Sequence, residues 1–374
     1  MHKNLDHSQH KGAMEESKIP INVITNQGFS TGVGRTASET YRVLKPYFPK
    51  LTLYSLNYIK NEELEFSNQI SKYHSRGLPT IPIVNWLNTR VIRRSGLLRN
   101  SNLHIIGTDY TLVEESRKNI IMAHELYFIL GEIFKVTSMR EFVKEIAFNY
   151  SVFLLQKYIK SAKYVVTPSK VSADQVKKAT GVTPVVAPIS VDKRKFHKRD
   201  KEKVREVLGL PKDKFLLLNV SGGGSNKNLR TMESIANNLP ENILILKINA
   251  PVYNKRVLNF GKVSEEHYPS FFSAADVYLH TSIHEGFGIP LLESLSSGLP
   301  IISPSCSTAP EILSKSGYYV QDPMSPQGYI EHITSLMDVQ LLKESQQMSL
   351  ERSNFFSDER LATTMGKLYL KAFA

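Results

Sequence analysis

The chain has 374 residues, of which 41% are hydrophobic, and one hydrophobic core rarely grows beyond roughly 250–300 residues, so two domains are expected. The formal net charge is +12, and residues 1–190 hold nearly all of the excess, with 25 Lys and Arg against 15 Asp and Glu. This basic half predicts an anionic partner. The single cysteine, Cys306, excludes an intramolecular disulfide, and no Cys/His cluster has the spacing of a zinc site.

The sequence predicts neither secretion nor insertion into a membrane. Residues 1–18 are polar and are expected to form a disordered tail without an apolar signal region. No run of about 18 apolar residues occurs, so no membrane-spanning helix is expected. These features favour a cytoplasmic protein and leave peripheral contact with the inner face of a membrane open.

Short β-rich runs alternate with helical stretches along the chain, a pattern typical of parallel, doubly wound α/β sheets. We expect a domain over residues 19–190, a second over 191–356, and a final helix over 357–374 that returns to the first domain. The expected strands are Ile21–Thr25, Leu51–Leu56, Leu103–Gly107, Asn119–Ala123, Tyr164–Pro168, Pro184–Pro188, Phe215–Val220, Ile243–Ile248, Val257–Phe260, Val277–His280 and Pro300–Pro304.

Two segments of the first half follow expected strands and carry groups that could contact a ligand. Gly28–Arg35 follows the first strand and opens a helix, and the alternative is a flexible surface loop. The strand ending at Ala123 is followed by His124, and a histidine at a strand end is more often structural.

A third segment of the first half, Arg76–Asn100, contains five arginines and no acidic residue, interleaved with apolar residues. This pattern predicts an amphipathic element that lies on an anionic membrane surface. The alternative is a core-facing helix with a solvated basic face.

In the second half, a glycine-rich segment, Val220–Asn228, follows an apolar strand and opens a helix. Its glycines, Gly222 among them, allow the backbone to approach a ligand closely. Lys227 offers a positive charge to a phosphate, and the alternative is a solvated helix start.

The most informative segment is His284–Leu299, His-Glu-Gly-Phe-Gly-Ile-Pro-Leu-Leu-Glu-Ser-Leu-Ser-Ser-Gly-Leu, which follows another apolar strand. Pro290 suits the first turn of a helix, whose free amides and dipole favour a diphosphate. Glu285 and Glu293 flank this turn, and carboxylates accept hydrogen bonds from vicinal sugar hydroxyls. A generic strand–loop–helix with glycine as a loop residue is the alternative.

Taken together, these segments resemble glycosyltransferase family 4, also called glycosyl transferases group 1, over roughly residues 20–374. The string from Glu285 to Glu293 resembles the Glu-x7-Glu motif of that family in its carboxylates, glycines, Phe and Pro. The resemblance implies the GT-B fold, in which two Rossmann-like domains face a cleft. It also implies that the C-terminal domain binds the donor and the N-terminal domain binds the acceptor.

The resemblance implies a role for each site residue. Glu285 and His124 would position the sugar, Glu293 the ribose, and Lys227 would stabilise the leaving diphosphate. The remaining donor-binding positions would be Gly32, Gly34, Gly222, Gly261, Val263, Gly286, Phe287, Gly288 and Ile289. The family usually has an arginine about five positions before the lysine, where this chain has Ser221 and Gly222. Arg35 and Arg230 are residues that could replace it, although the sequence shows neither doing so.

The implied reaction is the retaining transfer of a hexosyl unit, mannosyl or glucosyl, from a UDP- or GDP-sugar to a glycan or lipid-linked acceptor. No cofactor is expected, and no metal, because the chain has no Asp-x-Asp sequence. Nucleic acid is not an expected partner, because no known binding module is visible. Two alternatives stay open: sugar-nucleotide epimerisation or hydrolysis on the same fold, and a non-catalytic scaffold.

Overall fold

The computed structural model describes residues 19–25, 31–55, 102–107, 119–124 and 156–373, which form two compact units. Unit 1 comprises residues 1–189 and 358–374, and unit 2 comprises residues 190–357. The basic segment Arg76–Asn100 and the N-terminal tail lie outside the described residues. Among the helices that the structure describes, none is long and apolar enough to cross a bilayer.

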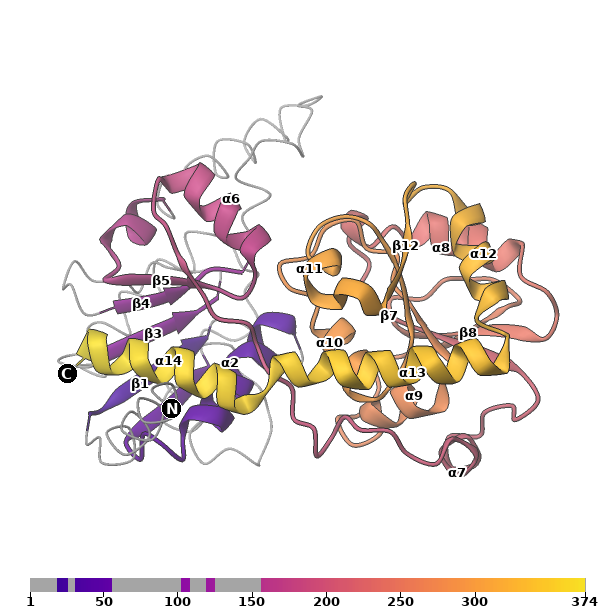
Figure 1. The fold of residues 1–374 in the computed structure, drawn as a ribbon, viewed down its shortest axis with the longest axis horizontal. Helices are drawn as coiled ribbons and strands as arrows, with labels where there is room; N and C mark the ends of the chain where they lie inside the picture. The colour runs from indigo at the N-terminus through magenta and orange to yellow at the C-terminus, as the bar shows by residue number, and fades with distance from the viewer. Residues whose placement is uncertain (1–18, 26–30, 56–101, 108–118, 125–155, 374) are drawn as a thin grey trace, which may run out of the picture. The chain divides into compact units, whose positions relative to one another are not determined.

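The described strands of unit 1 form one parallel sheet, in the order β2-β1-β3-β4-β5-β6 (Figure 1). Strand β1 lies between its two nearest successors in sequence, as in doubly wound sheets. The strands are β1 (Ile21–Thr25), β2 (Leu51–Ser55), β3 (Asn102–Ile106), β4 (Asn119–Met122), β5 (Tyr164–Thr167) and β6 (Val185–Val186).

Helices cover both faces of the unit 1 sheet. On one face α2 (Gly32–Leu44) packs beside the C-terminal helix α14 (Asp358–Phe373), in a cluster with Val23, Met122 and Met365. On the other face α6 (Lys170–Thr180) contributes Val176 to a cluster with Ile105 and Ile121. Ile106 belongs to the first cluster and Ile105 to the second, so β3 buries apolar side chains on both of its faces, as expected in a covered parallel sheet.

Unit 2 contains a second parallel sheet, in the order β12-β11-β10-β7-β8-β9. If its strands are numbered from one to six along the chain, the order is 3-2-1-4-5-6, which is that of the dinucleotide-binding Rossmann fold. The strands are β7 (Phe215–Ser221), β8 (Ile243–Asn249), β9 (Val257–Gly261), β10 (Val277–Leu279), β11 (Ile301–Pro304) and β12 (Gly317–Val320).

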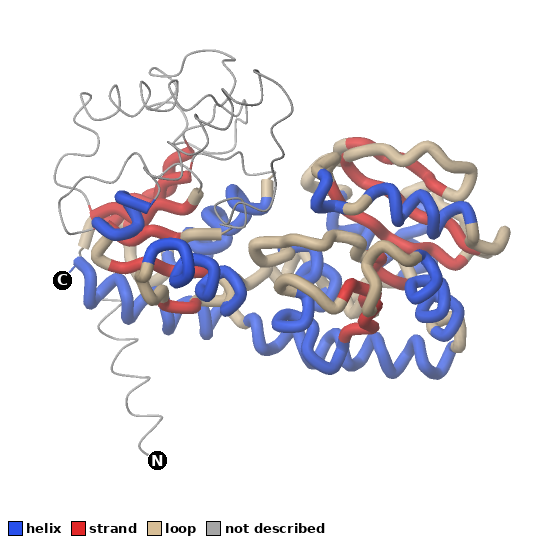
Figure 2. The backbone as a smooth tube through the Cα atoms, turned by 90° about the horizontal axis from the view of Figure 1, so that it is seen from above, coloured by secondary structure: helices blue, strands red, loops and turns tan. Residues whose placement is uncertain are grey.

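The helices of unit 2 also lie on both sides of its sheet, as Figure 2 shows for the strands between helical layers. Helices α8 (Leu229–Asn237) and α12 (Pro326–Ser335) pack together over one face. Against β7 on the other face lies α9 (Tyr268–Ala274), which also contacts α7 (Lys201–Val207). The remaining helices are α10 (Ile289–Ser296), α11 (Ala309–Leu313) and α13 (Val339–Ser353).

The predicted fold class is confirmed, because both sheets are parallel, six-stranded and covered by helices. Each predicted strand is present, with bounds that mostly differ by one residue, except for β6, which has two residues instead of five. One strand, β12, was not predicted. Its sequence Gly-Tyr-Tyr-Val is short and lies at the sheet edge, where three of four residues are only partly buried, so it has no continuous apolar run.

Candidate functional site

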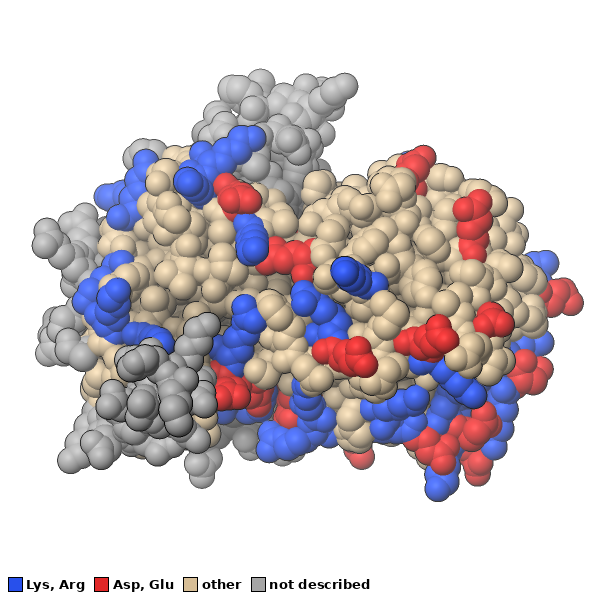
Figure 3. All heavy atoms as spheres, in the orientation of Figure 1, with Lys and Arg blue, Asp and Glu red and all other residues tan. Residues whose placement is uncertain are grey.

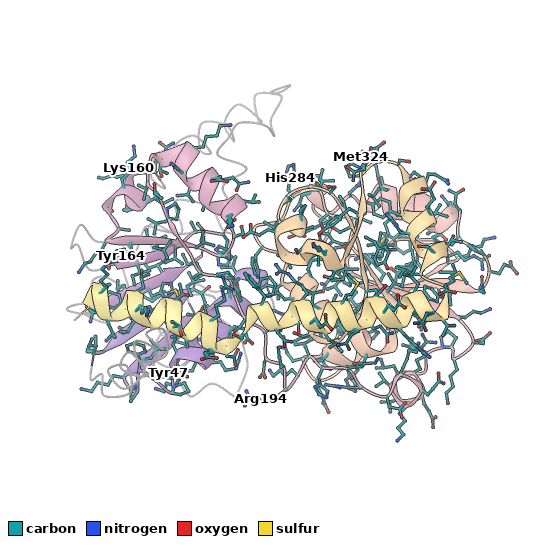
Figure 4. All side chains as sticks on the ribbon, in the orientation of Figure 1. Tyr47, Lys160, Tyr164, Arg194, His284 and Met324 are labelled. Atoms are coloured by element: carbon teal, nitrogen blue, oxygen red, sulfur yellow. The ribbon has the colours of Figure 1, made fainter. Side chains whose placement is uncertain are left out.

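The residues predicted to bind a donor in the second half of the chain meet at one place in unit 2. Strand order reverses between β7 and β10, which lie side by side. In open α/β sheets, ligands bind outside the carboxyl ends of the strands at such a point. The segment after β7 contains Gly222 and Lys227, and the segment after β10 contains Glu285 and Gly288. Figure 4 shows His284, next to Glu285, on the same side of unit 2 as Met324, which follows β12.

An ion pair joins these two segments. The Lys227 ammonium donates to Glu285 Oε1 at 2.7 Å, and the two side chains are only 21% and 16% exposed. Nearby, burial is the main cause that lowers the pKa of His280 to about 4, so this imidazole is neutral at physiological pH. Lys227 and Glu285, both predicted to meet the donor, are therefore adjacent, and each compensates the charge of the other.

Backbone contacts fix the ion pair in place. The 3₁₀ turn Ser225–Lys227 is tied to the segment after β10 by a bond from Thr281 Oγ1 to the Lys227 carbonyl, 2.8 Å long. Asn226 adds two contacts, from its Nδ2 to the His284 carbonyl at 3.0 Å and from the Ile283 amide to its own carbonyl at 2.9 Å. The loop geometry is therefore set before any ligand binds.

Ser307 holds the backbone of Glu285 from the other side. Its hydroxyl accepts from the Glu285 amide at 2.9 Å and donates to the Glu285 carbonyl at 3.0 Å. Ser307 has φ 55°, in the left-handed region, which is uncommon for serine. Next to Ser307, the Cys306 thiol donates to the Ile283 carbonyl at 3.4 Å, and burial raises the pKa of this thiol.

Helix α10 begins at the predicted position, with Gly288 as N-cap and Pro290 in the first turn. Gly288 has φ 93°, and a Cβ there would lie 2.9 Å from Leu291 Cδ1, so only glycine fits without strain. Because the N-cap is a glycine, it has no side chain that could accept a hydrogen bond from the first amides of the helix. An uncapped helix start presents amide donors and a partial positive charge to an anion.

Glu293 lies inside α10 and is 1% exposed. The Tyr268 hydroxyl, from the start of α9, donates to Glu293 Oε2 at 2.7 Å. This contact holds the carboxylate at a fixed position in the protein interior. Sequence reasoning missed Tyr268, because nothing local distinguishes it from the other aromatic residues of α9.

The other predicted donor-binding positions of unit 2 differ in exposure. Gly222 is exposed, and a Cβ there would meet no atom within 4 Å. Gly261 ends β9 with φ 60°, and Val263 follows it, both partly buried. Gly286, Phe287 and Ile289 are buried beside the Glu285 loop and the start of α10, and Thr308 Oγ1 donates to the Phe287 carbonyl at 2.8 Å.

Unit 1 contains the remaining predicted residues, at the carboxyl ends of β1 and β4. His124 is buried, and its Nε2 has no hydrogen-bond partner among the described residues. Burial lowers its pKa to about 4, so the ring is neutral at physiological pH. Gly32 opens α2 and is exposed, whereas the Gly34 amide donates to the capping Thr31 hydroxyl at 3.1 Å and so already has an acceptor.

The structure thus gathers Lys227, Glu285 and the start of α10 into one cluster in unit 2. Of the two arginines considered as a second cation, Arg230 is exposed at the start of α8 in unit 2, and Arg35 is partly buried on α2 in unit 1. Within the described ranges, no three His, Cys, Asp or Glu side chains are grouped so as to hold a metal ion.

Part of the chain is similar in sequence to known glycosyltransferases. Residues 241–352 match the family model described as "Glycosyl transferases group 1". The chain is 32% identical over 104 residues to O-antigen chain mannosyltransferase B of Escherichia coli, covering 28% of this chain and 27% of that protein. It is 25% identical over 276 residues to O-antigen chain mannosyltransferase RfbU of Salmonella typhimurium, covering 68% and 70% of the two chains. The chain therefore spans about a quarter of the first relative's length.

Solved structures show that the likeness in fold extends over nearly the whole chain. Anabaena HepE, in complex with UDP and glucose, superposes with a TM-score of 0.72 at 13% identity, covering 94% of this chain and all of that one. At this identity the likeness concerns the fold alone. The family match contains Glu285, Glu293 and the start of α10, whereas Lys227 lies outside it.

Proposed function

The chain belongs to the glycosyl transferases group 1 family, and from this premise we propose that it transfers a hexosyl unit from a nucleotide-diphosphate sugar to an acceptor hydroxyl, with retention of configuration. The observation that carries the proposal is the Lys227–Glu285 pair at the carboxyl ends of β7 and β10, in unit 2 together with the uncapped start of α10. A cation and free helix amides suit a leaving diphosphate, and a carboxylate suits sugar hydroxyls.

In the proposed reaction the bond between the anomeric carbon and the diphosphate oxygen breaks, and a bond from the acceptor oxygen to that carbon forms. The acceptor proton passes to an oxygen of the leaving diphosphate, so no protein base is required. Lys227 and the amides of α10 stabilise the charge that grows on the diphosphate. Glu285 orients the sugar, Glu293 the ribose, and the neutral His124 accepts or donates a hydrogen bond at the sugar without adding charge.

The donor class rests on the relatives. Both O-antigen enzymes are named mannosyltransferases, which supports a mannosyl unit, and HepE was crystallised with UDP and glucose, which supports a glucosyl unit. We propose GDP-mannose as the first donor to test and UDP-glucose as the second.

The acceptor class rests on charge. Unit 1 includes residues 156–180, in which six lysines stand against one acidic residue, Asp174. Figure 3 shows several Lys and Arg side chains on the visible described surface of unit 1, whereas both signs are mixed on unit 2. A basic surface suits a lipid-linked phosphate, an anionic glycan or peripheral contact with an anionic membrane.

A nucleotide-release assay tests the proposed function and separates it from its alternatives. The protein is incubated with GDP-mannose or UDP-glucose, with and without a mannose-terminated oligosaccharide or a monosaccharide linked to a lipid diphosphate. Release only in the presence of an acceptor, with a glycosylated product in the mass spectrum, supports transfer. Release without an acceptor indicates hydrolysis, a change of sugar without release indicates epimerisation, and no change in any mixture indicates a scaffold.

A further inference from the structure

Lys247 on β8 is a buried cation that the proposed mechanism does not use. Its side chain is fully inaccessible to solvent. The ammonium donates to the Ser221 carbonyl at 2.7 Å, to Ser221 Oγ at 3.1 Å and to the Ile248 carbonyl at 2.9 Å. Its three donors are thus satisfied by neutral oxygens, and no carboxylate pairs with it in the part of the chain that the structure describes.

Such an arrangement is costly, because a charge removed from water is normally balanced by an opposite charge. Burial lowers the pKa of Lys247 from its ordinary 10.5 to about 7. The neighbouring strands face it with neutral groups, since β7 pairs Asn219 with it and β9 pairs Asn259. Other ionisable groups of the site offer no compensation, because Lys227 and Glu285 pair with each other, and His280 and Tyr278 are buried and neutral.

The position of Lys247 connects it to the donor loop. Ser221 is the last residue of β7, and the exposed Gly222 to Gly224 follow it directly. The Ser221 hydroxyl donates to Asn219 Oδ1 at 2.7 Å, and Asn219 Nδ2 donates to the Leu279 carbonyl of β10 at 2.8 Å. A chain of hydrogen bonds therefore runs from β8 through β7 to β10, across the point where the strand order reverses.

The glycine-rich segment has one cation, Lys227, near its end. Between Ser221 and Asn226 there is no Lys or Arg, and Lys227 is already compensated by Glu285. A sugar nucleotide brings two negative charges on its diphosphate. A second positive charge near the diphosphate would stabilise it, and Lys247 is a buried cation whose ammonium contacts Ser221, the residue before the glycines.

We propose that Lys247 is a positioning residue for the donor: its ammonium fixes Ser221, and through it the glycine loop, and places an uncompensated positive charge beneath the diphosphate. This inference rests on the proposed function of the unit 2 site. Because Lys247 does not reach the surface, it makes no direct contact with the ligand. It acts through its hydrogen bonds to Ser221 and through the electric field of its positive charge.

The proposal predicts that donor binding takes up a proton. The ammonium is only partly protonated at neutral pH in the free protein, and an adjacent anion favours the charged form and so raises its pKa. Above about pH 7 the complex therefore binds more protons than the free protein, and affinity falls about tenfold for each pH unit until the pKa of the complex is reached. Below about pH 7 the affinity is insensitive to this group.

Calorimetry on the full chain tests this without any substitution. GDP-mannose and UDP-glucose are the probes, because their diphosphates lack the terminal phosphate that titrates near pH 6 in free nucleotides. Binding is measured at about pH 8 in two buffers that differ in ionisation enthalpy, and we expect an uptake of about 0.4 to 0.8 proton per donor bound, which corresponds to a tenfold to hundredfold preference of the donor for the charged ammonium. Binding without net proton uptake would overturn the inference and leave the proposed function standing. Absence of binding to either donor would overturn both.

Lys247→Met sharpens the test, with the exposed Lys343→Met of α13 as the matched control. We expect K247M to weaken donor binding by about tenfold to a hundredfold and to abolish proton uptake, whereas K343M changes neither. K247M removes a buried charge but also the donor to the Ser221 and Ile248 carbonyls, so thermal unfolding without ligand is measured to check that the variant is folded. Unchanged affinity and an unchanged pH profile in a folded K247M would overturn the inference.

Discussion

The two units share one architecture but bury different kinds of polar side chain. In unit 1 the buried ionisable groups of the described residues are neutral at physiological pH, namely His104, His124 and Tyr369. In unit 2 the buried set includes Lys247 and Glu293, and the half-buried Lys227–Glu285 pair lies nearby in sequence and space. Two similar sheets can thus differ in the ligands that they suit. The charged groups of unit 2 suit a diphosphate, and the neutral groups of unit 1 suit hydroxyls.

The largest expected effect comes from Lys227, because it is the partly buried cation beside Glu285 in the proposed donor site. Lys227→Met should lower the rate of transfer about a hundredfold to a thousandfold, the loss typical of removing one group that stabilises charge in the transition state. It also leaves Glu285 without its partner beside the diphosphate. The assay is nucleotide release in the presence of acceptor, with thermal unfolding as a check that the variant is folded.

A double variant separates the two roles of this ion pair. Lys227→Met with Glu285→Gln removes the uncompensated carboxylate, so we expect it to restore stability lost in the single variant but not the activity. Activity within about threefold of wild type in K227M, or restored activity in the double variant, would show that the pair is structural.

The next largest effect is expected on stability, at one of two glycines in unit 2 whose surroundings differ. Gly288→Ala should lower the free energy of unfolding by about 2 kcal/mol, since the residue has φ 93° and its Cβ would lie 2.9 Å from Leu291 Cδ1. Gly222→Ala should leave stability unchanged, because no atom lies within 4 Å of its Cβ. Chemical denaturation measures both.

Donor affinity then reports on Gly222 alone. If the diphosphate lies against this loop, the added methyl group should weaken binding of GDP-mannose or UDP-glucose about tenfold, by keeping the backbone away from the ligand. Equal donor affinity in Gly222→Ala and wild type would place the diphosphate elsewhere. A Gly288→Ala variant as stable as wild type would instead show that the start of α10 can relax.

The sequence predicted the sheets well because each strand that is covered on both faces is an apolar run. It assigned Lys227 and Glu285 to one site only through the family resemblance, and it did not predict their ion pair, since the two residues are 58 positions apart. It missed Lys247, although a signal exists: this lysine interrupts the run Ile243–Ile248, in which both faces are expected to be buried. A charged residue at such a position is either paired or functional.

Other partners could not be read from the sequence, because the contacts depend on how distant elements pack. Tyr268 reaches Glu293 across 25 positions, and Tyr369 reaches His104 across 265. The sequence predicted a final helix over residues 357–374, but not which of its residues would meet a polar group in the core.

The smallest expected effect tests unit 1, whose buried ionisable groups are neutral. The Tyr369 hydroxyl of α14 lies 2.6 Å from His104 Nδ1 on β3, in a fully buried contact. Tyr369→Phe deprives this imidazole nitrogen of its partner and should lower the free energy of unfolding by about 1 kcal/mol. Tyr47→Phe is the matched control, because Tyr47 packs against the same core and the structure gives its hydroxyl no hydrogen bond among the described residues.

The donor affinity of Y369F tests whether the buried groups of unit 1 play no part in donor binding. Tyr369 lies in unit 1, far in sequence from every residue of the unit 2 cluster, and its removal changes no charge there. Y369F should therefore bind GDP-mannose or UDP-glucose with the affinity of wild type while it unfolds at lower denaturant concentration. A loss of donor affinity in Y369F, with Y47F unchanged, would mean that the neutral buried groups of unit 1 contribute to donor binding. The proposed division of roles between the buried groups of the two units would then be wrong.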